Sequence, residues 1–95
     1  MKFEIDDEAL AEAEEARDHY AAIDPPLGDD FARALDSAID RIVSNPLLWS
    51  PYTDRTRRYV LGRFPYAVIY RLRGDLIRVL AVTHQSRRPG YWRAR

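Results

Sequence analysis

The side chains that could do chemistry are concentrated in the second half of this 95-residue chain. Residues 51–95 hold eleven arginines and no lysine against two acids, whereas residues 1–50 hold 13 acids against four cations. The basic half ends in a compact run from His84 to Trp92 that also contains Tyr91. A guanidinium is planar, bidentate and weakly hydrated, and aromatic rings stack on flat groups. The combination therefore suits phosphate, carboxylate or nucleobase partners.

The candidate binding residues are seven arginines of this half and three ring-bearing side chains. They are Arg57, Arg58, Arg63, Arg71, Arg78, His84, Arg87, Arg88, Tyr91 and Trp92. A single arginine on a strand is common at the solvent-exposed edge of a sheet, where its charge discourages pairing with other chains. Exposed Tyr, Trp and Arg together are typical of binding hot spots. Two interpretations of Tyr91 and Trp92 stay open: they bind a partner, or they fold back as a lid on the sheet.

Several enzyme and site classes find no support in the composition. The four glycines are scattered, so there is no phosphate-binding loop, and without cysteine there is no disulfide, thiolate site or cysteine nucleophile. With only His19 and His84 as imidazoles, we expect no metal and no cofactor. The start of the chain lacks the pattern of a signal peptide, and no apolar run is long enough to span a bilayer. We expect a cytoplasmic protein that makes no membrane contact.

The spacing of apolar residues predicts one α+β domain over residues 1–95. Lys2 to Ile5 alternates like a short strand, and the following helix begins at Asp6 or Asp7 and ends before Pro25-Pro26. Gly28 separates it from a second helix that runs from Asp29 or Asp30 to Asn45. After a loop over residues 44–56 come strands at 57–64, 66–72 and 76–83. The predicted order is β-α-α-β-β-β, with a helical hairpin packed on a small antiparallel sheet and a short basic C-terminal tail.

The many carboxylates of the first half fall on the outer faces predicted for the two helices. We therefore interpret them as a solvated acidic surface rather than as acid–base groups.

The pattern resembles the RelE/ParE superfamily of bacterial type II toxin–antitoxin systems over essentially the whole chain. The most specific segments are Phe64-Pro65-Tyr66-Ala67-Val68-Ile69-Tyr70 and the ending in which His84 is followed by Arg87. The resemblance implies the fold described above and a growth-arresting toxin that a cognate antitoxin neutralises. It implies no direct sequence-specific DNA binding without that antitoxin.

The superfamily divides by target, and the resemblance leaves two main alternatives. RelE-like members are ribosome-dependent, metal-free mRNA endonucleases that use basic side chains on the sheet. Arg58 matches one basic position, but Val60 and Ala67 fall where further basic residues are expected. For a nuclease, the candidate catalytic residues would be Arg58, His84, Arg87 and Tyr91, with the ribosome and mRNA as partners. ParE-like members lack the nuclease residues and inhibit DNA gyrase, and the two replacements favour this alternative. A third is an inactive module that retains only antitoxin binding.

Overall fold

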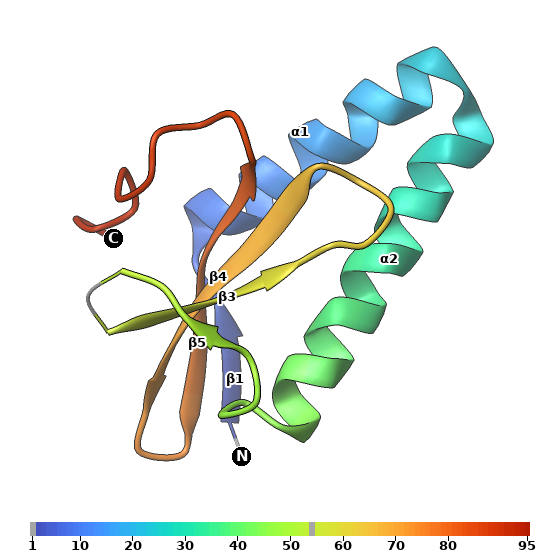
Figure 1. The fold of residues 1–95 in the computed structure, drawn as a ribbon. Helices are drawn as coiled ribbons and strands as arrows, with labels where there is room; N and C mark the ends of the chain where they lie inside the picture. The colour runs from blue at the N-terminus through green and yellow to red at the C-terminus, as the bar shows by residue number, and fades with distance from the viewer. Residues whose placement is uncertain (1, 54) are drawn as a thin grey trace.

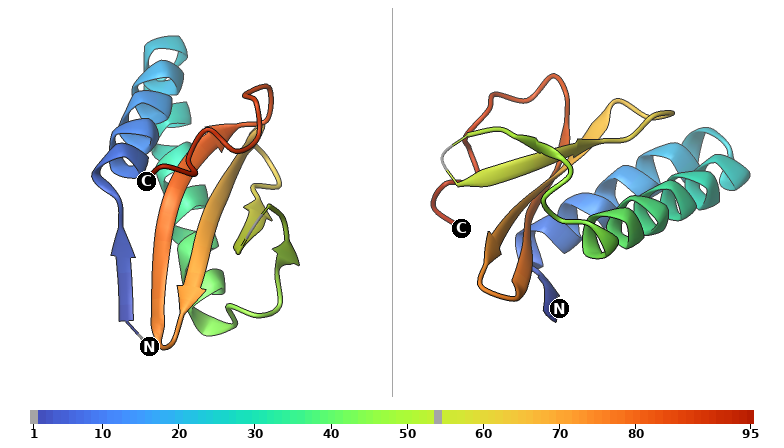
Figure 2. Two further views of the ribbon diagram at one scale, coloured as in Figure 1. Left: turned by 90° about the vertical axis from the view of Figure 1, so that its left-hand side faces the viewer. Right: turned by 60° about the horizontal axis from the view of Figure 1, so that its bottom comes forward.

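The computed structural model describes residues 2–53 and 55–95 and shows two helices against a five-stranded sheet (Figure 1). The elements are β1 (Lys2–Ile5), α1 (Asp7–Ile23), α2 (Pro25–Ser44), β2 (Ser50–Pro51), β3 (Thr56–Val60), β4 (Tyr66–Arg73) and β5 (Leu76–His84). The order across the sheet is β1-β5-β4-β3-β2. The helices lie on one face of the sheet, and the C-terminal segment curls back beyond β5 (Figure 2). The predicted α+β class and element order are confirmed.

Two details of the sheet differ from the prediction. β1 pairs with β5 in parallel, through Lys2↔Leu76 to Ile5↔Val79, so the sheet is mixed rather than wholly antiparallel. A parallel pairing of this kind needs long intervening chain, which the two helices supply. The expected loop also contributes β2, a two-residue strand that pairs Ser50 with Arg58.

The connection between the two helices is shorter than the positions of glycine and proline suggested. α2 begins at Pro25, four or five residues before the predicted start, because proline is well accommodated in the first turn of a helix. Gly28 is therefore inside α2, where it faces α1. A Cβ at this position would lie 2.7 Å from the Cβ of Ala21, so glycine is what allows the two helices to approach. The single residue Asp24 caps both helices.

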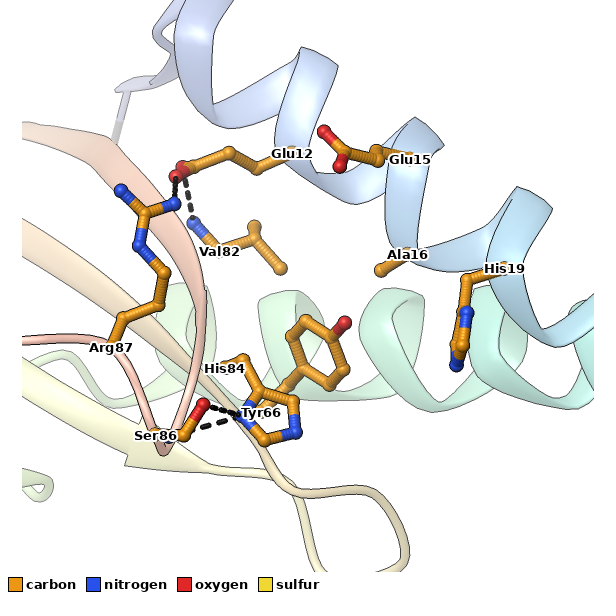
Figure 3. A pocket seen from close by; sticks show the side chains of 9 residues that line it. All are labelled: Glu12, Glu15, Ala16, His19, Tyr66, Val82, His84, Ser86 and Arg87. Atoms are coloured by element: carbon orange, nitrogen blue, oxygen red, sulfur yellow. Dashed lines mark hydrogen bonds and ion pairs between the residues drawn. The ribbon is translucent and has the colours of Figure 1, made fainter.

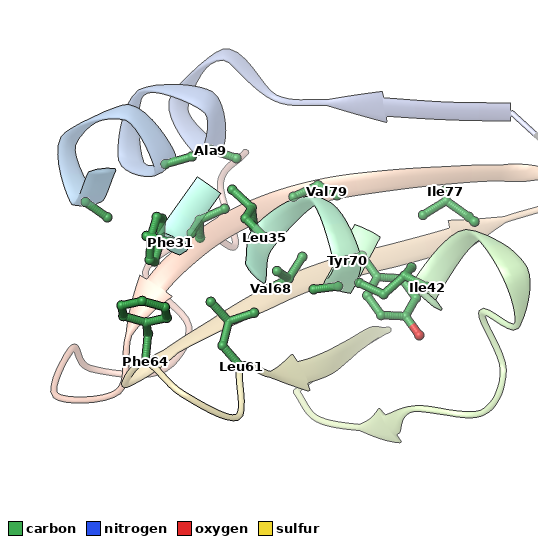
Figure 4. Close-up of a cluster of buried hydrophobic side chains, with 14 residues drawn as sticks. Ala9, Phe31, Leu35, Ile42, Leu61, Phe64, Val68, Tyr70, Ile77 and Val79 are labelled. Carbon is green, nitrogen blue, oxygen red and sulfur yellow. The ribbon is translucent and has the colours of Figure 1, made fainter. Parts of the chain in front are cut away.

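The main core lies between the helices and the sheet (Figure 4). The small residues Ala9, Ala13 and Ala16 of α1, which recur at helical spacing, are buried there. α2 contributes Phe31, Leu35, Ala38 and Ile42 at the same spacing. The strands supply the third wall with Val68, Tyr70, Ile77, Val79 and Val82.

β3 ends at Val60, four residues before the predicted boundary. Leu61 and Phe64 leave the strand and turn into the main core. The Leu61 N–H closes this turn on the Tyr66 carbonyl at 2.9 Å.

A second, smaller core covers the opposite face of the sheet. It consists of Ala67, Ile69, Leu80, Ala81 and Trp92, with Tyr52 and Tyr91 packed against it. A register shift places Ile69 opposite Ala81 but Tyr70 opposite Val79, so β5 has one extra residue at Leu80. Because of this bulge, the adjacent residues Leu80 and Ala81 both contribute to the second core.

Candidate functional site

The C-terminal tail, residues 85–95, packs on the sheet as a lid. Trp92 is only 1% exposed and stacks on Tyr52, with ring centroids 5.9 Å apart. A side chain this buried cannot meet a partner directly. Of the two interpretations left open for Trp92, the structure therefore supports packing on the sheet, and its candidate binding role would require the tail to move.

Glu12 of α1 anchors this tail. Its carboxylate accepts hydrogen bonds from the Tyr91 hydroxyl at 2.5 Å, the Arg95 guanidinium at 2.8 Å and the Val82 N–H at 3.2 Å. Arg95 also pairs with Glu8 at 2.7 Å and donates to the Leu80 carbonyl at 3.0 Å. Burial and then the bond to Glu12 raise the pKa of Tyr91, so its hydroxyl keeps the proton that it donates.

The anchoring role corrects one expectation from the sequence. The side chains of Glu12 and Asp6 are only 14% and 11% exposed, so these two acids do not belong to a solvated face. The sequence carried a signal for Glu12 that was missed. It lies three residues after Ala9 and four before Ala16, which places it beside the buried stripe of α1.

Between the tail and the sheet lies a hollow of about 380 Å³, which we call the tail-side hollow. Its cationic and polar wall comes from Arg58, Thr83, His84, Gln85 and Arg87, and its apolar part from Tyr52, Val60, Ala67, Ile69, Pro89 and Trp92. No acid is among these residues. The hollow therefore presents positive charge around an apolar floor.

The apolar floor brings together the two residues that depart from the RelE-like pattern. Val60 and Ala67 are direct partners across β3 and β4, and Val60 is 43% exposed. The two replacements thus form one continuous apolar strip. Arg58 lies next to it, with its guanidinium carbon 4.3 Å from the centre of the Tyr52 ring. This contact is a cation–π interaction that fixes Arg58 at one side of the hollow.

His84 and Arg87 stand at the boundary between the tail-side hollow and a second pocket of about 420 Å³, which we call the helix-side pocket (Figure 3). The chain's two histidines both line the helix-side pocket, together with Glu12 and Glu15 of α1. The Ser86 N–H donates to Nδ1 of His84 at 3.0 Å. A backbone N–H can only donate, so Nδ1 is the acceptor nitrogen and the neutral ring carries its proton on Nε2. The lone pair that a general base would use is thus already engaged.

The remaining candidate arginines mostly support the fold. Arg57 donates to the Trp49 carbonyl at 2.7 Å and holds the loop before β2. Arg63 pairs with Asp30 of α2 at 3.0 Å, and Arg78 joins β5 to Asp6 through its Nε at 2.7 Å. Arg71 is half-buried at the far end of the sheet.

The fold thus brings Arg58, His84 and Arg87 together at one hollow, with Tyr91 behind Arg87. It keeps Arg57, Arg63, Arg71 and Arg78 away from that hollow, while Arg88 lies on the exposed part of the tail. Sequence reasoning missed Glu12, Tyr52 and Arg95, whose roles depend on contacts between distant segments.

Within residues 2–53 and 55–95, no group of three or more His, Cys, Asp or Glu side chains is arranged to hold a metal ion. The same residues include no helix that is both long and apolar enough to cross a membrane.

A family model described as the ParE toxin of the type II toxin–antitoxin system parDE matches residues 3–89. The chain belongs to the ParE toxin family. Among solved structures, the chain resembles one described as the chromosomal ParDE toxin–antitoxin system from P. aeruginosa, with a TM-score of 0.69. That match has 21% sequence identity and covers 88% of this chain and 95% of the other, so it supports the shared fold. No curated protein matches the chain.

Proposed function

We propose that this ParE-family protein is a growth-inhibiting toxin that inhibits DNA gyrase through the tail-side hollow. The observation that carries the proposal is the apolar strip of Val60 and Ala67 at the floor of the hollow. Metal-free cleavage of RNA needs positioned positive charge around the phosphate and a free proton acceptor. Here an apolar surface lies between the cations, and the lone pair of His84 is engaged by Ser86. An apolar floor with a cationic wall suits a protein surface better than a reacting phosphate.

Membership of the ParE family and the likeness to a ParDE structure also support a cognate antitoxin as a partner. A toxin-binding segment of that antitoxin would carry acids toward the arginines of the hollow and apolar residues toward its floor. Such a segment would order on binding, as extended or helical recognition segments do.

A supercoiling assay tests the proposal. Purified protein is added to gyrase, ATP and relaxed plasmid, and the supercoiled product is measured on a gel. We expect inhibition at micromolar protein, weakened by Arg58→Ala. The matched control is Arg73→Ala, which also removes one arginine of the sheet but at the end of β4 that lies away from the hollow. Undiminished supercoiling at micromolar wild-type protein would refute gyrase as the target.

A second candidate function is ribosome-dependent mRNA cleavage, because Arg58, His84 and Arg87 do line the same hollow. Toe-printing of a translated message distinguishes the two. New 3′ ends that require both ribosomes and the protein would favour the nuclease, and an intact message would exclude it. Unimpaired growth after induction without antitoxin would instead favour a module that only binds antitoxin.

A further inference from the structure

Arg87, like Arg58, is held on the face of an aromatic ring. Its guanidinium carbon lies 3.9 Å from the centre of the Tyr91 ring, which places the cation on the aromatic face. The side chain is 53% exposed and lines both the tail-side hollow and the helix-side pocket. Stacking fixes the plane of a guanidinium without consuming its N–H donors. Arg87 is therefore oriented and still able to bind an acid.

Glu12 lies within ion-pair distance of Arg87, but it does not occupy the N–H donors of the guanidinium. The closest approach between them is 3.8 Å, longer than a hydrogen bond. The two oxygens of Glu12 are already engaged at 2.5 Å by Tyr91 and at 2.8 Å by Arg95. The shorter bonds fix the Tyr91 ring against Arg87. The longer contact leaves the N–H donors of the Arg87 guanidinium available to a partner.

Arg95 is a second cation that contacts the Tyr91 ring. Its guanidinium carbon lies 5.1 Å from the Tyr91 ring, and its side chain is only 13% exposed. The Tyr91 ring is thus enclosed by two cations while its hydroxyl is fixed by Glu12. A swing of the side chain about its Cα–Cβ bond would move the hydroxyl away from Glu12, so the ring cannot leave Arg87 without losing that hydrogen bond.

We propose that Glu12 is a positioning residue of the toxin: by holding Tyr91, it sets Arg87 at the wall of the tail-side hollow to receive a carboxylate of the target protein. The proposal rests on the proposed function in taking the tail-side hollow as the target-binding surface. We expect the group on the target protein that binds Arg87 to be a carboxylate. Two arginines, Arg58 and Arg87, line the hollow, its floor is apolar, and no acid is among its described lining residues. Glu12 itself makes no contact with the target in this arrangement.

Two variants of Glu12 and a matched control separate positioning from general stability. Glu12→Ala removes the acceptor for Tyr91, whereas Glu12→Gln keeps an oxygen that can accept from the hydroxyl. Glu8→Ala is the control, because Glu8 pairs with Arg95 but has no hydrogen bond or ion pair with Tyr91 or Arg87. Tyr91→Leu removes the aromatic platform itself and serves if Glu12→Ala fails to fold.

The first measurement does not depend on the target. In an NMR spectrum of the purified protein, the Arg87 Nε–H signal is identified by its loss in Arg87→Ala. We expect the Tyr91 ring to shift this signal upfield. The shift should collapse in Glu12→Ala and Tyr91→Leu, recover at least in part in Glu12→Gln, and persist in Glu8→Ala. An Arg87 signal that is the same in wild type, Glu12→Ala and Tyr91→Leu overturns the proposal.

The second measurement is a double-mutant cycle on the concentration that half-inhibits supercoiling. Loss of one exposed cation–π contact predicts that Glu12→Ala weakens inhibition about 2- to 5-fold. In the Arg87→Ala background, Glu12→Ala should not weaken inhibition further, because Glu12 acts through Arg87. If Glu12→Ala weakens inhibition equally in both backgrounds, the positioning role is refuted. If the wild-type protein does not inhibit gyrase, the proposed function fails, and the Arg87 signal alone decides the role of Glu12.

Discussion

Replacing Trp92 with alanine tests whether the C-terminal tail is part of the fold. The indole is 1% exposed and forms the largest side chain of the second core, against Ile69, Leu80 and the Tyr52 ring. Truncating a buried Trp to alanine costs about 3–5 kcal/mol, because burial is lost and a cavity remains. For a domain of this size, that loss corresponds to a fall in Tm of at least about 12 °C.

The assay is urea unfolding followed by far-UV circular dichroism, which does not depend on the fluorescence of the tryptophan that is removed. Trp92→Phe keeps an aromatic ring against Tyr52 and should lose less than the alanine variant. Arg88→Ala is the matched control in the same tail, since Arg88 is exposed, and we expect a change within about 0.5 kcal/mol.

A loss of less than about 1 kcal/mol in Trp92→Ala, with an unchanged urea dependence, would refute this reasoning. It would mean that the tail leaves the sheet in solution and that the second core contributes little. Trp92 would then become available as a binding side chain, which is the other interpretation of the sequence.

Three further predictions concern the fold. Removing residues 87–95 should unfold or aggregate the protein rather than only abolish toxicity, because it deletes Trp92 and both ends of the Arg87–Tyr91 contact; a cooperative unfolding transition like that of wild type would contradict this. Gly28→Ala should destabilise the helical hairpin by about 1–3 kcal/mol, measured by urea unfolding, because the new Cβ meets Ala21, and Ala21→Gly in the same chain should restore part of the loss. Burial raises the pKa of Tyr70 and of Tyr91, so the fold favours the neutral phenols. Their contribution to the free energy of unfolding is complete below the unfolded pKa of about 10 and is lost as pH rises toward the folded values; absorbance titration at 295 nm, with urea unfolding from pH 8 to 11, checks this.

Local patterns predicted most of the fold because they follow from the geometry of each element. The spacing of Ala9, Ala13 and Ala16 is that of one helix face, and alternation places Val68 and Tyr70 on the same face of β4; in the fold both faces line the main core. The start of α2 was wrong because Pro25-Pro26 and Gly28 are ordinarily breakers. Here the prolines occupy the first turn, and the glycine serves the packing of the two helices. That use depends on Ala21 in the other helix, which no local pattern contains.

The candidate site could be predicted only in part, for a related reason. The sequence identified Arg58, His84 and Arg87, and the fold places all three at one hollow. What it could not supply were contacts between segments about 80 residues apart, such as Glu12 with Tyr91. The parallel pairing of β1 with β5 is another long-range contact of this kind, and it was also missed. Side-chain roles decided by tertiary contact are not encoded in spacing.

The separation of charge along the sequence acquires a different meaning in the folded protein. The acidic half is not simply an outer surface, because its carboxylates neutralise many arginines of the basic half. Arg78 meets Asp6, Arg63 meets Asp30, and Arg95 meets both Glu8 and Glu12. These pairs join α1 and α2 to the sheet and the tail, so a net charge of +9 on residues 51–95 greatly overstates the charge available to a partner. At the tail-side hollow, Arg58 and Arg87 are held instead by the rings of Tyr52 and Tyr91, and the Glu12 carboxylate comes no nearer to Arg87 than 3.8 Å. A cation held by an aromatic ring keeps its N–H donors free, whereas one held by a carboxylate does not. The arginines that matter for binding are therefore expected to be those that stack rather than those that pair.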